Sequence, residues 1–216
     1  MPDYPEVVFA DIYKNHVWGD GTPGNPRSGS GSNPDVAKPY VDFVSRAIQE
    51  FDISYVLDFG CGDWEMWRDY KFENTNYTGI DVVEELIETN IIKYSNRNRS
   101  FHLSSLKASL SNYELLLCKD VLQHLSNVDM DQLLLQLSKF KYLIFQNDKC
   151  SQEDQNNLEC HTGGWRPINL KSTFFDDRFK DFELIGEICY YPYAPGDYYF
   201  KEVLMFRNMT ARRWKC

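Results

Sequence analysis

The stretch SYVLDFGCGDW, residues 54–64, decides the fold. Its apolar residues up to Phe59 predict a short buried strand, and Gly60 and Gly62 follow where a parallel strand turns into a helix. Glycines at such a turn let the backbone approach a ligand, and the N–H groups of the next helix attract an anionic group. Farther along, YTGID at residues 77–81 predicts a second strand, which ends on Asp81.

The spacing between these two strand ends is that of a nucleoside site. An acidic residue roughly 20 positions after the glycines is placed to accept hydrogen bonds from two ribose hydroxyls. The alternative is an ordinary turn, with Asp81 capping a helix near Glu84. A dinucleotide site needs a third glycine where this chain has Glu65, so a nucleotide-sugar or NAD enzyme is the weaker reading.

Strand and helix patterns continue to alternate along the chain. Strands are expected at 54–59, 77–81, 100–103, 113–119 and 141–146, and helices at 35–51, 64–70, 83–94, 121–125 and 130–140. Beyond a polar loop at 148–167, strands at 182–190 and 199–207 suit an antiparallel edge hairpin. We therefore expect an α/β fold with a doubly wound, mostly parallel, Rossmann-like seven-stranded sheet. Residues 1–34 form a leader with a helical lid, and residues 35–216 form one domain.

Composition and charge restrict the class of partner. The chain has 216 residues and a net charge of −9, which disfavours nucleic acid, because a nucleic-acid binder normally presents a basic stripe. We find neither an apolar run long enough for a membrane span nor a signal peptide, and no CxxC pair suggests zinc. We expect a cytoplasmic protein with reduced thiols, in which Cys61 and Cys118 are buried.

The acidic-Gly-Gly string at 58–62 resembles the first motif of class I S-adenosylmethionine-dependent methyltransferases. The resemblance extends over residues 54–146: GID at 79–81 is similar to the second motif of the family, and LLLCKDVLQHL at 115–125 to its fourth. It implies S-adenosylmethionine as cofactor and S-adenosylhomocysteine as product. At the third motif the chain departs from the family, since residues 103–105 offer hydroxyls instead of an acidic residue. By resemblance, the cofactor contacts are Asp58, Gly60, Gly62, Trp64, Asp81, Val82, Ser105, Cys118 and Lys119.

The leader string IYKNHVWG…RSGSGS, within residues 12–32, resembles that of O-methyltransferases that accompany glycosyltransferases in bacteria and large DNA viruses. The leader also resembles that of the methyltransferases that act on the rhamnose-containing glycans of chloroviruses. If the protein is viral, this resemblance implies that it works in the cytoplasm of the host. The resemblance implies a glycan or sugar acceptor and a glycosyltransferase as a further partner. Tyr13 and Trp18 would cover the adenosyl group, with Ser28, Gly29 and Ser30 facing the amino-acid carboxylate. A flexible linker is the alternative for SGSGS.

Methyl transfer to a sugar hydroxyl requires removal of a proton, and Asp120, His124 and Asp148 are the candidates. Asp120 and His124 are four residues apart on a predicted helix face, so Asp120 can orient His124 as the base. The alternative is that Asp120 caps the helix and His124 packs under the sheet. Asp120 with Asn147 and Asp148 is also an oxygen set that suits Mg²⁺, which we leave open without favouring it.

The loop and hairpin after residue 147 supply the candidate acceptor contacts His161, Trp165 and Tyr193. Aromatic rings with polar edges suit a sugar, although a hairpin packed on the sheet explains the tyrosines equally well. A small-metabolite methyltransferase, or a non-catalytic partner of a glycosyltransferase that keeps the cofactor pocket, are the alternative functions.

Overall fold

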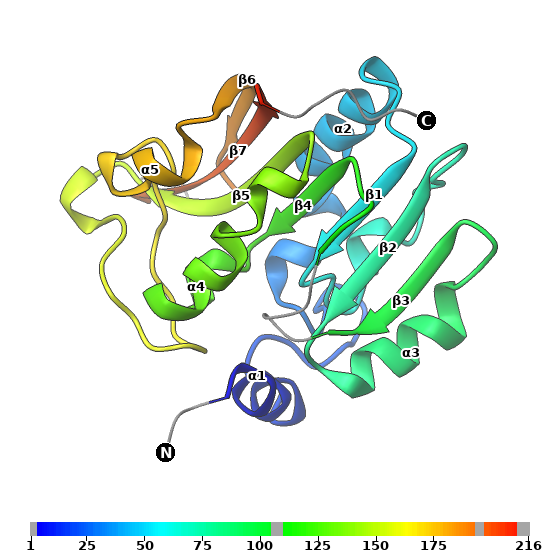
Figure 1. The fold of residues 1–216 in the computed structure, drawn as a ribbon. Coiled ribbons are helices and arrows are strands. Elements are labelled where there is room, and N and C mark those ends of the chain that lie inside the picture. The colour runs from blue at the N-terminus through cyan, green and yellow to red at the C-terminus, as the bar shows by residue number, and fades with distance from the viewer. Residues whose placement is uncertain (1–3, 105–109, 193–196, 211–216) are drawn as a thin grey trace. The chain divides into compact units, whose positions relative to one another are not determined.

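The computed structural model describes residues 4–104, 110–192 and 197–210 (Figure 1). Its contacts divide the chain into two compact units, Met1–Ala108 and Ser109–Cys216. The leader belongs to the first unit, and the candidate proton acceptors belong to the second. The expectation of one domain over residues 35–216 stays a prediction.

The first unit carries three parallel strands in the order β3-β2-β1. These are β1 (Tyr55–Phe59), β2 (Asn76–Asp81) and β3 (Arg99–Leu103), and α3 (Glu84–Tyr94) joins the last two. The leader forms α1 (Pro5–Lys14) and a short 3-10 turn (Ser30–Ser32), and α2 (Pro34–Glu50) leads into β1. In parallel register, Asp58 lies beside Gly79 and Phe59 beside Ile80.

Helix α2 shows why its sequence is helical. The Asn33 side chain accepts a hydrogen bond from the Asp35 N–H and caps the first turn, where Pro34 has no N–H that would need an acceptor. The buried positions follow helical spacing: Ala37, Tyr40, Val44, Ala47 and Ile48. Pro39 lies inside the helix, where it has no main-chain N–H to donate.

The second unit carries four strands in the order β4-β5-β7-β6. These are β4 (Leu115–Lys119), β5 (Tyr142–Cys150), β6 (Phe182–Tyr190) and β7 (Tyr199–Asn208). Strands β4 and β5 are parallel, and β7 runs antiparallel to both β5 and β6. Helices α4 (Asn127–Leu134) and α5 (Asp176–Phe179) complete the unit. The direction pattern confirms the predicted fold class: seven strands, mostly parallel, with an antiparallel edge.

Three local expectations were wrong. The helix expected at 64–70 is a 3-10 turn (Glu65–Trp67) that follows Trp64 in a left-handed conformation, with φ 60°. The helix expected at 130–140 ends at Leu134 and gives way to a 3-10 turn (Leu137–Lys139). Strand β5 continues to Cys150, so Asp148 lies in the strand and not in the predicted loop.

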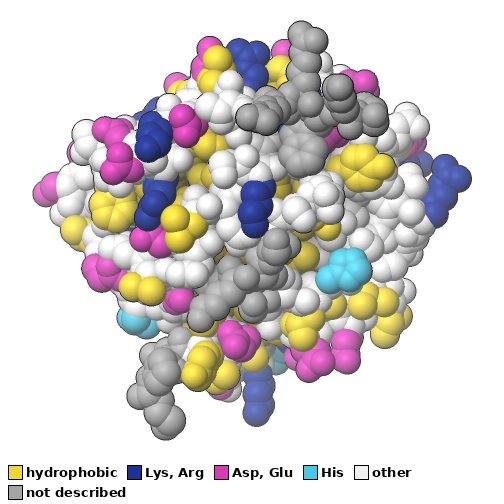
Figure 2. All heavy atoms as spheres, in the orientation of Figure 1, with side chains coloured by type: hydrophobic (Ala, Val, Ile, Leu, Met, Phe, Trp, Pro, Cys, Tyr) yellow, Lys and Arg dark blue, Asp and Glu magenta, His cyan; other side chains and the backbone are white. Residues whose placement is uncertain are grey.

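On the face drawn in Figure 2, Lys and Arg side chains stand among acidic ones. Cys61 and Cys118 are buried, as predicted. No helix within the described ranges has the length and apolarity that a membrane crossing requires.

Candidate functional site

The turn after β1, residues 60–64, is built from left-handed conformations and is called the glycine turn below. Gly60 has φ 74° and Gly62 has φ 55°, values that L-residues with a side chain rarely adopt. The N–H groups of Gly60 and Cys61 both donate to the carbonyl oxygen of Ile80, at 2.9 and 3.0 Å. The end of β2 therefore fixes the glycine turn.

The side chain of Asp81, the last residue of β2, also stabilises the glycine turn. Its Oδ2 accepts from the Gly62 N–H at 2.9 Å, and its Oδ1 accepts from the Val83 N–H at 3.0 Å. Burial raises the pKa of Asp81, while these main-chain donors act in the opposite direction. A carboxylate oxygen can accept more than one hydrogen bond, so Asp81 retains capacity for ribose hydroxyls.

The leader packs directly on the glycine turn. The Ser28 Oγ lies 2.9 Å from the Tyr13 hydroxyl oxygen and accepts from the Asp63 N–H at 2.8 Å, while the Ser28 N–H donates to Asp63 Oδ2 at 3.1 Å. A Cβ on Gly62 would stand 2.3 Å from Ser28 Oγ. Tyr13 and Ser28 of the leader therefore lie at the glycine turn. The sequence motifs predict that this turn binds the cofactor, and the leader was expected to cover the cofactor there.

The other leader residues surround Tyr13. The rings of Tyr13 and Trp18 meet edge to face with centroids 5.4 Å apart. Gly29 has φ 86°, and a Cβ there would lie 3.6 Å from the Trp18 Cβ. Ser30 begins the 3-10 turn and is exposed. Burial raises the pKa of Tyr13, so its hydroxyl stays protonated and able to donate at neutral pH.

Asp58 and Trp64, two predicted cofactor contacts, have side chains in the core. Asp58 is 1% exposed, and its Oδ2 accepts from the Tyr77 hydroxyl at 2.6 Å and from Trp67 Nε1 at 3.0 Å. The Trp64 ring is buried within an aromatic cluster that includes Tyr77 and Phe101. Both side chains therefore support the glycine turn from within.

The remaining predicted contacts fall in different places. Val82 is half-buried directly after Asp81, and Cys118 is fully buried in β4. Ser105 lies outside the described residues; the preceding Ser104 donates its N–H to the Asp81 carbonyl at 2.9 Å.

The second unit contains four charged side chains in mutual contact: Lys119, Asp120, Asp148 and Lys201, called the carboxylate–lysine cluster below. Lys119 Nζ lies 2.6 Å from Asp120 Oδ2, and Lys201 Nζ lies 2.7 Å from Asp120 Oδ1 and 2.8 Å from Asp148 Oδ1. Lys201 reaches Asp148 because the two residues are register partners across β5 and β7. The two ammonium groups balance the two carboxylates, which is how charges are tolerated in a protein interior.

The cluster determines which carboxylate can accept a proton. Burial alone would raise the pKa of Asp120, but the ammonium groups of Lys119 and Lys201 outweigh it and hold that pKa well below its usual range. Asp120 is therefore a weak base. Burial also lowers the pKa of the Lys119 ammonium, against the pull of Asp120.

Two glutamines anchor the carboxylates further. Gln123 Nε2 donates to Asp148 Oδ2 at 3.2 Å, and the Asp148 N–H donates to Gln123 Oε1 at 2.7 Å. Gln146 Nε2 donates to Asp120 Oδ2 at 3.2 Å and Gln146 Oε1 accepts from the Tyr190 hydroxyl at 2.6 Å. The cluster is thus fixed in one geometry.

His124 is oriented by the loop and not by Asp120, so the predicted pair was wrong. Its Nδ1 lies 2.7 Å from the Gly164 carbonyl oxygen, which places the proton of the neutral ring on Nδ1. Nε2 is then the acceptor, and it lies 3.4 Å from Gln123 Nε2. Burial lowers the pKa of His124, so the ring is neutral at pH 7. The predicted helix face does not exist, because Asp120 is left-handed (φ 54°) and a 3-10 turn (Leu122–His124) follows.

The loop after β5 brings Trp165 to the cluster. Trp165 Nε1 donates to Asp148 Oδ2 at 3.1 Å, its ring meets that of Tyr199 edge to face at 5.1 Å, and the residue is 44% exposed. His161 is exposed, and its main-chain carbonyl accepts from the Gly164 N–H at 2.9 Å. Tyr193 lies outside the described residues.

The oxygen set considered for Mg²⁺ does not suit a metal ion. The Lys201 ammonium lies between the carboxylates of Asp120 and Asp148, in the place that a divalent ion would need. Asn147 and Asp148 are neighbours in a strand, so their side chains point to opposite faces. Within the described ranges no group of three or more His, Cys, Asp or Glu side chains is arranged for a metal.

Three contributors were missed from the sequence: Lys201, Gln123 and Gln146. The sequence did contain a signal for Lys201, because this charged residue lies next to an apolar strand run (VLMF, 203–206). A charged residue in such a strand indicates a buried ion pair. The glutamines had none, because their role depends on the register of β5 and the turn after β4.

Comparison with known proteins shows which proteins share this fold. No protein-family model and no curated protein matches the chain. The structure is similar to the N-methyltransferase NodS from Bradyrhizobium japonicum in complex with S-adenosyl-L-homocysteine (TM-score 0.66, 12% identity, covering 93% of this chain and 98% of that one). It is also similar to a SAM-dependent methyltransferase from Anabaena variabilis (0.63, 14%, 94% and 94%) and to magnesium protoporphyrin IX methyltransferase from Synechocystis with bound SAH (0.62, 12%, 94% and 99%). The chain thus shares the fold of SAM-dependent methyltransferases.

Proposed function

We propose that this protein transfers a methyl group from S-adenosylmethionine to a hydroxyl of a sugar, on a rhamnose-type deoxysugar of a glycan. The observation that carries the proposal is the glycine turn, held from one side by Asp81 and covered from the other by Ser28 and Tyr13. The fold shared with methyltransferases supports the choice of cofactor.

The first unit supplies the groups that would bind the cofactor. Asp81 is placed to accept the ribose hydroxyls, and Ser28 and Tyr13 present hydroxyl donors at the glycine turn. Gly62 lets these groups approach, because any side chain at that position would occupy the space of Ser28 Oγ. When bound, the cofactor supplies a methyl group already activated by its sulfonium, so the protein has mainly to align the acceptor.

The second unit supplies the proton acceptor, and His124 suits that role best. Its ring is neutral at pH 7 because burial lowers its pKa, and Gly164 fixes the tautomer in which Nε2 is the acceptor. Gln123 Nε2 lies 3.4 Å from that nitrogen, and the acceptor hydroxyl would take its place. Asp120 and Asp148 act by holding the carboxylate–lysine cluster and, through Gln123, the turn that carries His124.

A sugar acceptor is supported by Trp165. Its ring is 44% exposed while its Nε1 is fixed to Asp148, which is the combination of an apolar face and an ordered polar edge that sugars bind. Exposed Tyr191 and Tyr198 add rings near the same hairpin. A glycosyltransferase partner remains a prediction from the leader, and a cytoplasmic location remains a prediction from the sequence as a whole.

The test is a mass-spectrometric assay on rhamnosylated oligosaccharides incubated with protein and S-adenosylmethionine. The proposal predicts that the sugar gains one methyl group and that S-adenosylhomocysteine forms. His124→Gln should keep cofactor affinity and lower turnover by roughly 10²–10⁴, whereas His102→Gln, an exposed control, should leave turnover nearly unchanged.

Other outcomes would correct the proposal. Methylation of a small metabolite but of no oligosaccharide would contradict the glycan acceptor, and methylation of an amine would contradict the hydroxyl. Cofactor binding without transfer to any acceptor would favour a non-catalytic partner of a glycosyltransferase.

A further inference from the structure

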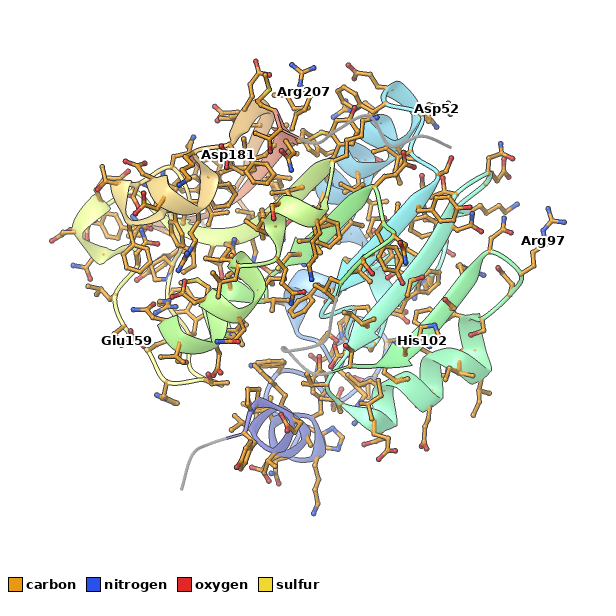
Figure 3. The ribbon with its side chains drawn as sticks, in the orientation of Figure 1. Asp52, Arg97, His102, Glu159, Asp181 and Arg207 are labelled. Carbon is orange, nitrogen blue, oxygen red and sulfur yellow. The ribbon has the colours of Figure 1, made fainter. Side chains whose placement is uncertain are left out.

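A second candidate site lies in the first unit, away from the glycine turn. A surface hollow of about 400 Å³ opens at the amino ends of β2 and β3, whereas Asp81 stands at the carboxyl end of β2. We call it the basic hollow. Its main polar lining residues are Lys71, Asn74, Asn96, Arg97, Asn98 and Arg99. Figure 3 shows Arg97 pointing outward beyond the amino end of β3, with His102 near the other end of that strand.

The charge of the hollow contrasts with that of the chain. Lys71, Arg97 and Arg99 face one carboxylate, Glu73, which leaves an excess of two positive charges in a protein of net charge −9. Within the part of the chain that the structure describes, none of these three cations forms an ion pair, whereas Arg27 and Arg178 each do. An unpaired excess of cations in a concave surface attracts an anion.

Arg99 is held ready for such an anion. Its guanidinium lies 4.7 Å from the centroid of the Trp64 ring, which restricts its orientation through a cation–π contact. Its Nε is buried and has no hydrogen-bond partner among the described residues. Burial also lowers the pKa of Arg99, so the group has lost hydration that a ligand anion would replace.

The turn before β3 is fixed as well. Asn96 Oδ1 accepts from the Asn98 N–H at 2.9 Å, and Asn96 pairs with Arg99 in an isolated antiparallel bridge. Asn74, across the hollow, is left-handed with φ 61°. The amides of these residues offer both donors and acceptors, which suits the hydroxyl groups of a polar ligand.

We propose that the basic hollow binds a small phosphate ester of about hexose-phosphate size. Arginine recognises phosphate through two parallel hydrogen bonds, and two arginines with a lysine match the charge of one phosphate group. The volume falls within the range of small-ligand sites, roughly 300–1,000 Å³, and exceeds what inorganic phosphate would fill. Three cations are too few for a nucleic-acid backbone, which requires a larger basic surface. This inference is independent of the proposed methyl transfer.

The experiment is a titration of the ¹⁵N-labelled full chain with glucose 6-phosphate, glucose and inorganic phosphate, followed by NMR. Glucose 6-phosphate should give saturable shifts confined to residues 71–74 and 96–99, and glucose should give none. Arg97→Gln should weaken binding about tenfold, the loss expected for one charge-assisted hydrogen bond at an exposed position. Arg46→Gln removes the same charge from an exposed residue of α2 and should leave the affinity unchanged.

Three results would overturn the proposal. Absence of saturable shifts at the hollow with either phosphate compound would remove the site. Inorganic phosphate binding as tightly as the ester would refute a ligand of hexose-phosphate size. An equal loss in Arg46→Gln and Arg97→Gln would show general electrostatic attraction instead of a site. None of these results bears on cofactor binding, which is measured separately.

Discussion

Lys201→Met tests the carboxylate–lysine cluster most severely. The side chain of Lys201 is 5% exposed and contacts two carboxylates, Asp120 at 2.7 Å and Asp148 at 2.8 Å. Methionine fills a similar volume without charge, so the variant leaves buried carboxylates with one ammonium group fewer. Removal of one partner from a buried ion pair costs about 3–5 kcal/mol. We expect the free energy of unfolding to fall by that amount at pH 7.

The effect should depend on pH with a defined sign. The pKa of Asp120 is held below its ordinary value of 3.8, so its contribution to stability is present above that value and is lost as pH falls through the lowered pKa. Without Lys201 the pKa of Asp120 is lowered less, and the variant binds the proton at higher pH. The stability gap between wild type and variant is therefore full at pH 7 and narrows below about pH 4.

The assay is urea unfolding followed by tryptophan fluorescence, to which Trp165 contributes through its bond to Asp148. Lys180→Met, at an exposed lysine just after α5, removes the same charge and should change stability by less than about 0.5 kcal/mol. Adding Asp148→Asn to Lys201→Met should restore part of the loss, because the buried charges balance again. A Lys201→Met variant as stable as the Lys180→Met control would show that the Lys201 ammonium does not stabilise the two buried carboxylates.

Three further results follow from the same contacts. Gly62→Ala should lower the free energy of unfolding by about 1–3 kcal/mol more than Gly24→Ala, because both have positive φ but only the first Cβ would meet Ser28 Oγ. Thermal unfolding of the two variants measures the difference, and equal losses would show that the leader does not pack on the turn. The pKa of His124 should lie below its ordinary value of 6.5 by NMR titration, since burial lowers it; a midpoint at or above 6.5 would contradict the neutral base. Asp58→Asn should cost about 1.5–3 kcal/mol in urea unfolding, because two buried donors lose a charged acceptor. A loss within about 0.5 kcal/mol would contradict a structural role for that carboxylate.

Local pattern was enough for the strands and for the glycine turn. The run from Tyr55 to Phe59 is apolar and ends on glycines, and the structure forms β1 and the glycine turn there. Asp81 follows the next strand at the expected spacing and bonds to Gly62. These features depend on neighbouring residues in one βα unit, and such short-range signals are legible in a single sequence.

The second unit shows why the rest was not predictable. Helical spacing suggested that Asp120 orients His124, but the left-handed conformation of Asp120 breaks that periodicity and Gly164 takes its place. Lys201 lies 81 residues from Asp120 and meets it only through the pairing of β5 with β7. Pairing register is a tertiary property, so residue types alone do not reveal this contact.

The side-chain direction of Trp64 was also not predictable from the sequence. Trp64 comes two residues after Gly62, and its position suggested a cofactor contact, whereas its ring packs among Tyr77 and Phe101. The left-handed φ of 60° at Trp64 turns the side chain into the core. A bulky residue in that conformation is rare, so no sequence rule would have anticipated its direction.

Calorimetric titration with S-adenosylmethionine tests whether the glycine turn and Asp81 bind the cofactor. Wild type should bind the cofactor with one site, and Asp81→Ala should raise its Kd by roughly a hundredfold or more, since two hydrogen bonds to a carboxylate are lost. Asp69→Ala, at an exposed position of the same unit, should leave Kd unchanged, and Asp81→Asn separates lost binding from a distorted turn. A Kd for Asp81→Ala equal to that of wild type would show that the Asp81 carboxylate does not bind the cofactor.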